Sequence, residues 1–291
     1  MQRVRVPEVD YTAYSNRQLV AIPLILLAVA LLIIGGTWFF TGSPAHMGLD
    51  FTGGVEITIE TDADRAEIEA AFEREPDSIQ SVPAEGDVFI LTFRADEEED
   101  REMQAIEAQA IEAGFDVRSI NAVSPAFGSD RQLQAVGGVI LAFLGMSVLV
   151  AIIFRTFVPS LAIIASAFSD IMIPIALMNL LGIELSLGTV AALLMLIGYS
   201  VDSDILLNNH ILRRRGDFYE STQRAMRTGV TMTTTSIVAM VVMTIVAWIF
   251  QIPLLPAVGI VLVFGLCADL MNTYLLNVSL LRYYKYEGIA K

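Results

Sequence analysis

Lysine, cysteine and histidine are all scarce in this chain of 291 residues, and their scarcity excludes several classes of protein. The two histidines, His46 and His210, stand far apart in the sequence and form neither a metal-ligand cluster nor a nucleophile–base pair. Nothing in the sequence therefore predicts an enzyme, a catalytic residue, a metal site or a cofactor, and we expect no nucleic-acid partner. Cys267 is the only cysteine, which excludes an intramolecular disulfide.

The charged residues that are present are unevenly distributed. The chain has a formal net charge of −14, although 55% of its residues are hydrophobic and its mean hydropathy is +0.61. Residues 42–133 carry 22 Asp and Glu against 6 Arg, whereas the other 199 residues carry 10 acidic and 12 basic side chains. This indicates an acidic soluble domain inserted into a nearly neutral hydrophobic protein. The acid-rich, lysine-poor composition favours a high-salt habitat, where salt screens charge repulsion; an acidic interaction surface is the alternative.

Long apolar stretches predict a polytopic α-helical membrane protein. Leu19–Phe40 contains 22 uncharged residues, enough to cross about 30 Å of hydrocarbon. It has no convincing cleavage site, so we interpret it as a retained helix rather than a signal peptide. Five further stretches follow. The six predicted transmembrane helices cover residues 19–41, 134–155, 159–182, 186–210, 229–250 and 255–281.

The basic residues outside the acidic region predict the orientation of these helices. All 12 of them fall in the terminal segments or in loops that six spans place on one side of the membrane. Short loops on the cytoplasmic side are enriched in Lys and Arg. We therefore expect the N-terminal segment 1–18, the loop 211–228 and the tail 282–291 to be cytoplasmic, and residues 42–133 to be extracytoplasmic.

The acidic region between the first two helices has the pattern of an α+β domain. Apolar alternation predicts strands at residues 54–60, 87–93 and 115–123, with a short strand near 78–82. Helical spacing of apolar residues predicts helices at 62–75 and 99–114. The resulting order βαββαβ is that of the ferredoxin-like fold.

Several carboxylates lie inside the predicted spans, where a charge is costly and commonly marks a functional site. Asp170 lies about 15 Å into the third span and Asp269 about 21 Å into the last one, at 1.5 Å per residue. Asp202 lies near the middle of the fourth span. Asp204 is about 200° around the same helix from Asp202 and shares a face with Ser200. Each acid could either exchange ions or be held by neighbouring hydroxyls as a structural contact.

The fifth span begins with an arginine and a run of threonines. Arg227 could extend to the interface as an anchor or turn inward toward a carboxylate. Thr231, Thr234 and Thr235 could bond to their own backbone or line a polar path. The sequence leaves both alternatives open.

Two motifs carry a resemblance to a known family. The stretch "MGLDFTGGVEI" (47–57) follows the first span, and "IGYSVDSD" (197–204) lies in the fourth. Together they resemble the SecF family of protein-export membrane subunits, in its archaeal form, within the resistance-nodulation-division superfamily. The resemblance covers about Gln18 to Leu281. The outer-loop motif contains Gly48, Asp50, Phe51, Gly53 and Gly54.

This resemblance implies an accessory role in protein export. It implies a SecD partner, the Sec translocon and unfolded preprotein substrates, with the chain embedded in membrane lipid and driven by a transmembrane ion gradient. By position it assigns ion coupling to Asp202 and Arg227, and leaves open whether the ion is a proton or sodium. An exporter of lipids or small molecules, and an assembly factor that transports nothing, are the alternative functions.

Overall fold

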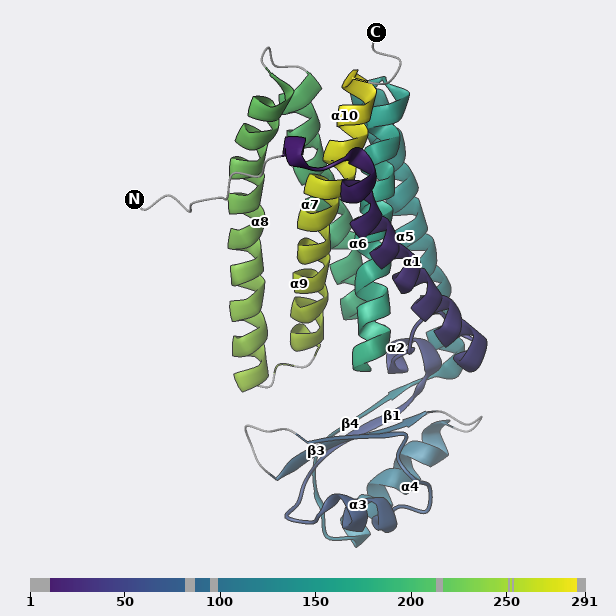
Figure 1. Ribbon diagram of the computed structural model, residues 1–291. Coiled ribbons are helices and arrows are strands. Elements are labelled where there is room, and N and C mark those ends of the chain that lie inside the picture. Colours follow the sequence, from purple (N-terminus) through teal and green to yellow (C-terminus); the bar gives the residue numbers. More distant parts are fainter. Residues whose placement is uncertain are drawn as a thin grey trace. The chain divides into compact units, whose positions relative to one another are not determined.

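The computed structural model (Figure 1) describes residues 11–81, 87–94, 99–212, 217–250, 252 and 254–286. Predictions that fall on residues 1–10, on Arg213–Arg215 and on 287–291 lie outside the described residues. The chain divides into two compact units. One is helical, and the other consists of residues 47–137 and 247–253 and contains the sheet.

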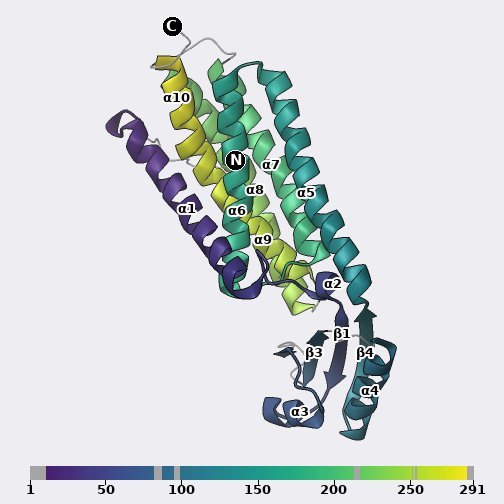
Figure 2. The ribbon, with the colours of Figure 1, turned by 90° about the vertical axis from the view of Figure 1, so that its right-hand side faces the viewer.

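Within the described residues, six helices are long and apolar enough to cross a membrane, which confirms the predicted number of spans. The last span is interrupted: its first and last parts are α-helical, with a short π-helical segment, η2, between them. Figures 1 and 2 show these helices side by side. They are α1 (Asn16–Thr41), α5 (Pro125–Phe154), α6 (Phe157–Leu181), α7 (Leu187–Leu212), α8 (Phe218–Ile249), and α9 (Leu255–Met271) with η2 (Asn272–Asn277) and α10 (Val278–Tyr286).

The centre of the helical unit is formed by α6, α7 and α9. About half of the apolar stretch of α6 and of α7 is buried, 56% and 50%, against 11% for α5 and α8. Gly265 on α9 explains part of this close packing, because a Cβ there would collide with the Leu196 side chain on α7. The central helices consequently have protein on most sides, whereas α1, α5 and α8 present apolar side chains outward, as lipid requires.

A short helical turn before the first span is tied to the last one. This turn, η1 (Tyr11–Ala13), buries the Tyr11 side chain, whose hydroxyl donates to the Tyr274 carbonyl oxygen of η2 at 3.2 Å. Arg282 Nη1 on α10 donates to the Tyr11 and Tyr14 carbonyl oxygens at 2.9 and 3.0 Å. Burial raises the pKa of Tyr11 to about 12. The hydroxyl therefore remains protonated, and a donor, throughout the neutral pH range.

The sheet unit has the predicted ferredoxin-like order. Its four strands are all antiparallel and lie in the order β2-β3-β1-β4, with α3 after β1 and α4 after β3. The alternating apolar residues of β1, Val55, Ile57 and Ile59, are fully buried against the helices. The elements are β1 (Gly54–Glu60), α3 (Arg65–Ala71), β2 (Ser78–Ser81), β3 (Val88–Arg94), α4 (Glu99–Glu112) and β4 (Asp116–Val123).

The outer-loop motif forms a single helical turn that leads directly into β1. This turn, α2 (Leu49–Thr52), buries Phe51 and is followed by Gly53 and Gly54, both with positive φ (74° and 137°). A Cβ on Gly54 would collide with the Phe93 carbonyl oxygen of β3. Glycine is thus required at Gly54 by both backbone conformation and close approach.

We predict that residues 45–128 fold without the membrane helices, because the core of the domain is internal to it. Circular dichroism should show one cooperative unfolding transition, in molar salt if the net charge of −16 over residues 42–133 requires screening. Ile57→Ala should lower the free energy of unfolding by about 2–5 kcal/mol. Thr58→Ala, on the opposite face of the same strand, should change it by less than about 1 kcal/mol. A random-coil spectrum at every salt concentration would reject the prediction.

Candidate functional site

Asp170 on α6 is a fully buried acid in the helical unit. Its Oδ2 accepts a hydrogen bond from Ser200 Oγ on α7 at 2.6 Å, and its Oδ1 accepts one from Asn272 Nδ2 on η2 at 2.6 Å. Both donors are neutral. Pro174 lies four residues further along α6 and has no N–H to offer the Asp170 carbonyl, so the helix is locally weakened at this acid.

A second fully buried acid, Asp204, lies on α7 and receives its partners from η2. Thr273 Oγ1 and Asn277 Nδ2 both lie close to its Oδ1, at 2.9 and 2.8 Å. Its Oδ2 is buried and has no hydrogen-bond partner among the described residues. An unpartnered carboxylate oxygen away from water costs free energy unless an ion, a proton or a water supplies the missing bond.

The third acid, Asp269, belongs to α9 and is 1% exposed. Ser203 Oγ on α7 donates to its Oδ1 at 2.8 Å, and Thr273 Oγ1 lies 3.2 Å from the same oxygen. Thr273 therefore stands between Asp204 and Asp269. The two acids belong to one hydrogen-bonded network, and Asp170 is attached to the same helices through Ser200 and Asn272.

The π-helical segment positions the donors of this network. The Val278 N–H bonds to the Thr273 carbonyl oxygen, five residues back instead of the usual four. The wider turn brings Asn272, Thr273 and Asn277 toward acids that lie on two different helices. π-Helical turns inside α-helices occur frequently at functional sites. Here three of the six residues of η2 donate to the two fully buried acids.

The network is acidic and has no basic counterpart. No ion pair joins Asp170, Asp204 or Asp269 to a basic side chain in the described part of the chain. Over the same residues, no group of three His, Cys, Asp or Glu is arranged to hold a metal ion. Several other buried oxygens lack partners among the residues described: Ser166 Oγ, Ser169 Oγ, Asn208 Oδ1, Asn272 Oδ1 and Asn277 Oδ1. Such an arrangement suits the exchange of small, positively charged species or protons.

Other predicted site residues lie outside this network. Asp202 is exposed on the surface of α7, in agreement with its predicted angular separation from Asp204. Arg227 is exposed on α8, and so are the three threonines of the suggested polar path. Thr231 Oγ1 donates to the Arg227 carbonyl oxygen at 2.7 Å, and Thr235 Oγ1 donates to the Thr231 carbonyl oxygen at 2.7 Å. Two of the threonines thus bond to their own backbone, whereas Ser200 is a direct partner of Asp170.

Sequence reasoning missed Ser203, Asn272, Thr273 and Asn277, which supply most of the hydrogen bonds to the acids. A signal for two of them, Thr273 and Asn277, exists in the last span. Asp269, Thr273 and Asn277 recur every four residues, and a four-residue polar repeat in an apolar helix predicts one polar stripe. The π-helical turn that completes the contacts has no comparable signature.

Comparison with known proteins defines the class of protein that carries this site. A family model described as "Protein export membrane protein SecD/SecF, C-terminal" matches residues 104–287. A second, the "SecD/SecF GG Motif", matches residues 38–64, which include the outer-loop motif. The chain is therefore a protein-export membrane protein of the SecD/SecF type.

The curated relatives specify the family within this class. The protein-export membrane protein SecF of Haloferax volcanii is 65% identical, with 100% of both chains covered, and that of Haloquadratum walsbyi is 64% identical with the same coverage. The chain belongs to the SecF family. Both relatives come from halophilic archaea, in agreement with the predicted archaeal form and with the high-salt interpretation of the composition.

Solved structures show the fold. The crystal structure of SecDF, a translocon-associated membrane protein from Thermus thermophilus, has a TM-score of 0.77 at 20% identity and covers 96% of this chain. SecDF in its super-membrane-facing form has a TM-score of 0.65 at 22% identity and covers 99% of this chain. The chain spans 39% and 40% of those two chains, about two fifths of their length.

We predict that Asn277→Ala destabilises the helical unit. It removes a hydrogen bond of 2.8 Å to a fully buried carboxylate, so the free energy of unfolding should fall by about 1–3 kcal/mol. Asn209→Ala is the matched control, since it deletes the same atoms from α7 without breaking a bond to an acid. Thermal unfolding of both variants in detergent measures the difference, and equal midpoints would contradict the prediction.

Proposed function

We propose that this chain is the subunit that acts with a SecD partner and the Sec translocon to promote preprotein translocation, driven by a transmembrane proton gradient. In this proposal both termini are cytoplasmic and residues 42–133 are extracytoplasmic. The family membership supports the export role. The distribution of basic residues supports the orientation, because all 12 outside the acidic domain fall in segments assigned to the cytoplasm.

The SecDF neighbours support a SecD partner. The solved SecDF chains are more than twice as long as this one, which covers 39% and 40% of them. A separate SecD chain would supply the remainder. It would also cover exposed polar side chains at membrane depth, among them Asp202 on α7, for which lipid offers no hydrogen bonds.

Thr273 carries the argument for proton exchange. Its Oγ1 lies 2.9 Å from Asp204 Oδ1 and 3.2 Å from Asp269 Oδ1. A threonine hydroxyl has one proton and can donate to only one of these oxygens at a time. When it donates to Asp204, Asp269 can bond to the same hydroxyl only as a protonated acid. The geometry is therefore satisfied by one proton held on one of the two acids.

Transfer of that proton changes which helix carries a charge. Asp204 belongs to α7 and Asp269 to α9, so each protonation state favours a different packing of the two helices. A proton that moves inward down the membrane potential supplies roughly 2.3 kcal/mol per 100 mV. We propose that repeated protonation and release drive the helical unit between two packings, and that the outer domain moves with it to draw the exported chain outward.

The decisive comparison is between Asp204→Asn and Asp202→Asn. These variants make the same chemical change two residues apart on α7, one inside the network and one on the exposed face. Motif position favoured Asp202 as the coupling acid, whereas the geometry favours Asp204. In vesicles that contain the chain, its SecD partner and the translocon, an imposed gradient should stimulate preprotein transport by the wild type and by Asp202→Asn, but not by Asp204→Asn. Co-purification of SecD at equal expression controls for assembly.

The reverse outcome would place the coupling acid on the surface that faces the partner. Retention of stimulation by Asp170→Asn, Asp204→Asn and Asp269→Asn alike would favour an assembly factor whose acids are structural. Gradient-driven export of a lipid or small molecule by the chain without SecD would favour an exporter. Stimulation by a sodium gradient at constant pH, and not by a pH gradient, would replace the proton by Na⁺.

A separate prediction concerns the shared hydroxyl. Thr273→Val keeps the shape of the side chain but removes the group that links Asp204 to Asp269, so gradient-dependent transport should fall by about a hundredfold, the lower end of the range for loss of a positioned proton-transfer group. Thr273→Ser retains a hydroxyl and should retain most of the stimulation. The two variants are compared in the same vesicles, and equal transport rates would show that the hydroxyl does not carry the proton.

A further inference from the structure

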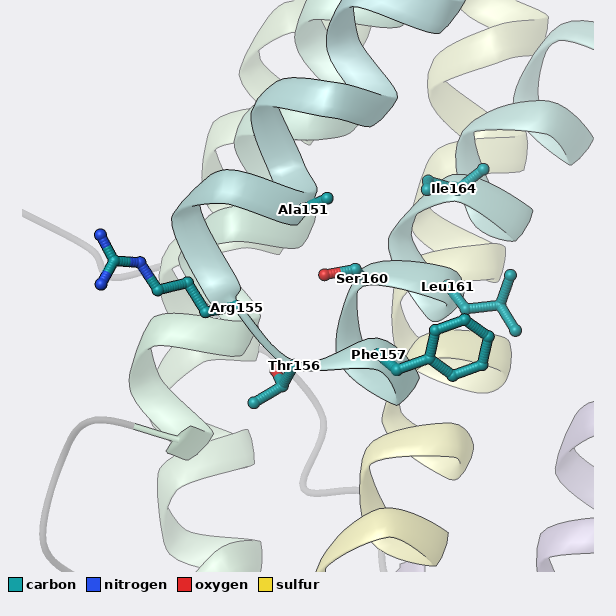
Figure 3. A pocket seen from close by; sticks show the side chains of 7 residues that line it. All are labelled: Ala151, Arg155, Thr156, Phe157, Ser160, Leu161 and Ile164. Carbon is teal, nitrogen blue, oxygen red and sulfur yellow. The ribbon is translucent and has the colours of Figure 1, made fainter.

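A cavity lies at the turn between α5 and α6, away from the acidic network (Figure 3). Its volume is about 280 Å³. The turn joins the ends of two membrane-spanning helices, so the cavity lies at the level where hydrocarbon meets the polar surface of the membrane. All of its lining residues lie between Ala151 and Ile164, within the helical unit.

The polar side of the cavity offers hydrogen-bond donors that have no acceptor. Ser160 is 7% exposed, its Oγ points into the cavity in Figure 3, and it has no hydrogen-bond partner among the described residues. Thr156 Oγ1 is also buried without a partner in this part of the chain. Thr156 precedes the first residue of α6, yet its side chain does not cap the helix. The first N–H groups of a helix have no partner within the helix and attract anions.

Arg155 adds a positive charge at the same turn. It is exposed, and its guanidinium extends outward from the turn in Figure 3. Its φ of 53° is one of only two positive values at non-glycine positions in the described chain. A left-handed backbone is costly for a residue with a side chain and is found disproportionately at binding sites. The turn therefore combines an arginine, two hydroxyls and a helix N-terminus, all of which favour an anion.

The remaining wall of the cavity is apolar. Phe157 and Leu161, which are 79% and 50% exposed, project outward from α6, and Ala151 faces them from α5. Ile164 continues the apolar surface one turn further into the membrane. A free phosphate would leave this surface uncovered, whereas the chain of a lipid would bury it.

We propose that this cavity binds one anionic phospholipid. The headgroup phosphate lies at the mouth of the cavity near Arg155, and the hydroxyls of Thr156 and Ser160 donate to phosphate or glycerol oxygens. The first part of one hydrocarbon chain lies along Phe157, Leu161 and Ile164. This assignment does not depend on ion coupling, since the cavity shares no residue with the acidic network.

Native mass spectrometry of the purified full-length chain in detergent tests the proposal, with phosphatidylglycerol and phosphatidylcholine as probes. The wild type should retain one phosphatidylglycerol at saturation and bind phosphatidylcholine more weakly. Arg155→Gln should weaken retention by about fivefold, the scale of one basic side chain at an anionic lipid surface. Ala151→Phe leaves the charge unchanged but fills the cavity, and should abolish saturable binding.

Arg17→Gln is the matched control for charge, because Arg17 is an exposed arginine on α1 far in sequence from the cavity. It should bind phosphatidylglycerol like the wild type. Loss of binding in Arg17→Gln equal to that in Arg155→Gln would show general electrostatic attraction and overturn the proposal. Unchanged binding in Ala151→Phe would overturn it as well, as would displacement of the lipid by millimolar glycerol phosphate, which has no hydrocarbon chain. A melting temperature near the wild-type value establishes that each variant is folded.

Discussion

The helical unit is organised around one constraint, the burial of uncompensated carboxylates in a low-dielectric interior. Lipid offers them no hydrogen bonds, and no basic side chain forms an ion pair with them in the described chain. Their partners must therefore be neutral groups on neighbouring helices, and α7 and η2 supply Ser200, Ser203 and Thr273 among them. This requirement explains why α6, α7 and α9 are central and why α9 is followed by a π-helical turn. The acids keep a polar interior in a unit whose outer helices present mostly apolar side chains.

The two units solve opposite solvation problems. In the helical unit, charge is scarce and each carboxylate needs a specific donor. Among residues 42–133, acids outnumber arginines by 22 to 6, and no acid whose exposure the structure describes is buried. Such a surface repels itself in dilute buffer and is screened in concentrated salt. The internal apolar core of β1 and α3 supplies the free energy that folds the domain. The salt concentration of the medium sets how much charge repulsion this free energy must overcome.

Much of this architecture could be predicted from the sequence, because its signals are local. Long uncharged stretches predict spans, and the alternation of Val55, Ile57 and Ile59 predicts a strand with one buried face. The inward face of a central membrane helix is harder to predict. Both the lipid-facing and the protein-facing sides are apolar, so hydrophobic periodicity hardly indicates which side faces the protein. The sequence therefore placed Asp202 and Asp204 on different faces of α7, and motif position favoured Asp202 as the coupling acid. Tertiary packing at Gly265 and η2 instead buries Asp204.

The bond between the Tyr11 hydroxyl and the Tyr274 carbonyl oxygen gives the acidic network a mechanical connection to the start of the chain. Tyr274 follows Thr273 directly, so rotation of η2 that repositions the shared hydroxyl also pulls on η1. Arg282 on α10 binds the same turn, so η1 is attached to the last span at two places. Three residues after η1, α1 begins and runs without interruption to Thr41, and the peptide then continues into the outer-loop motif. The turn held by the last span is therefore joined to the outer-loop motif through one continuous helix, so the proposed coupling has a covalent route between the two units.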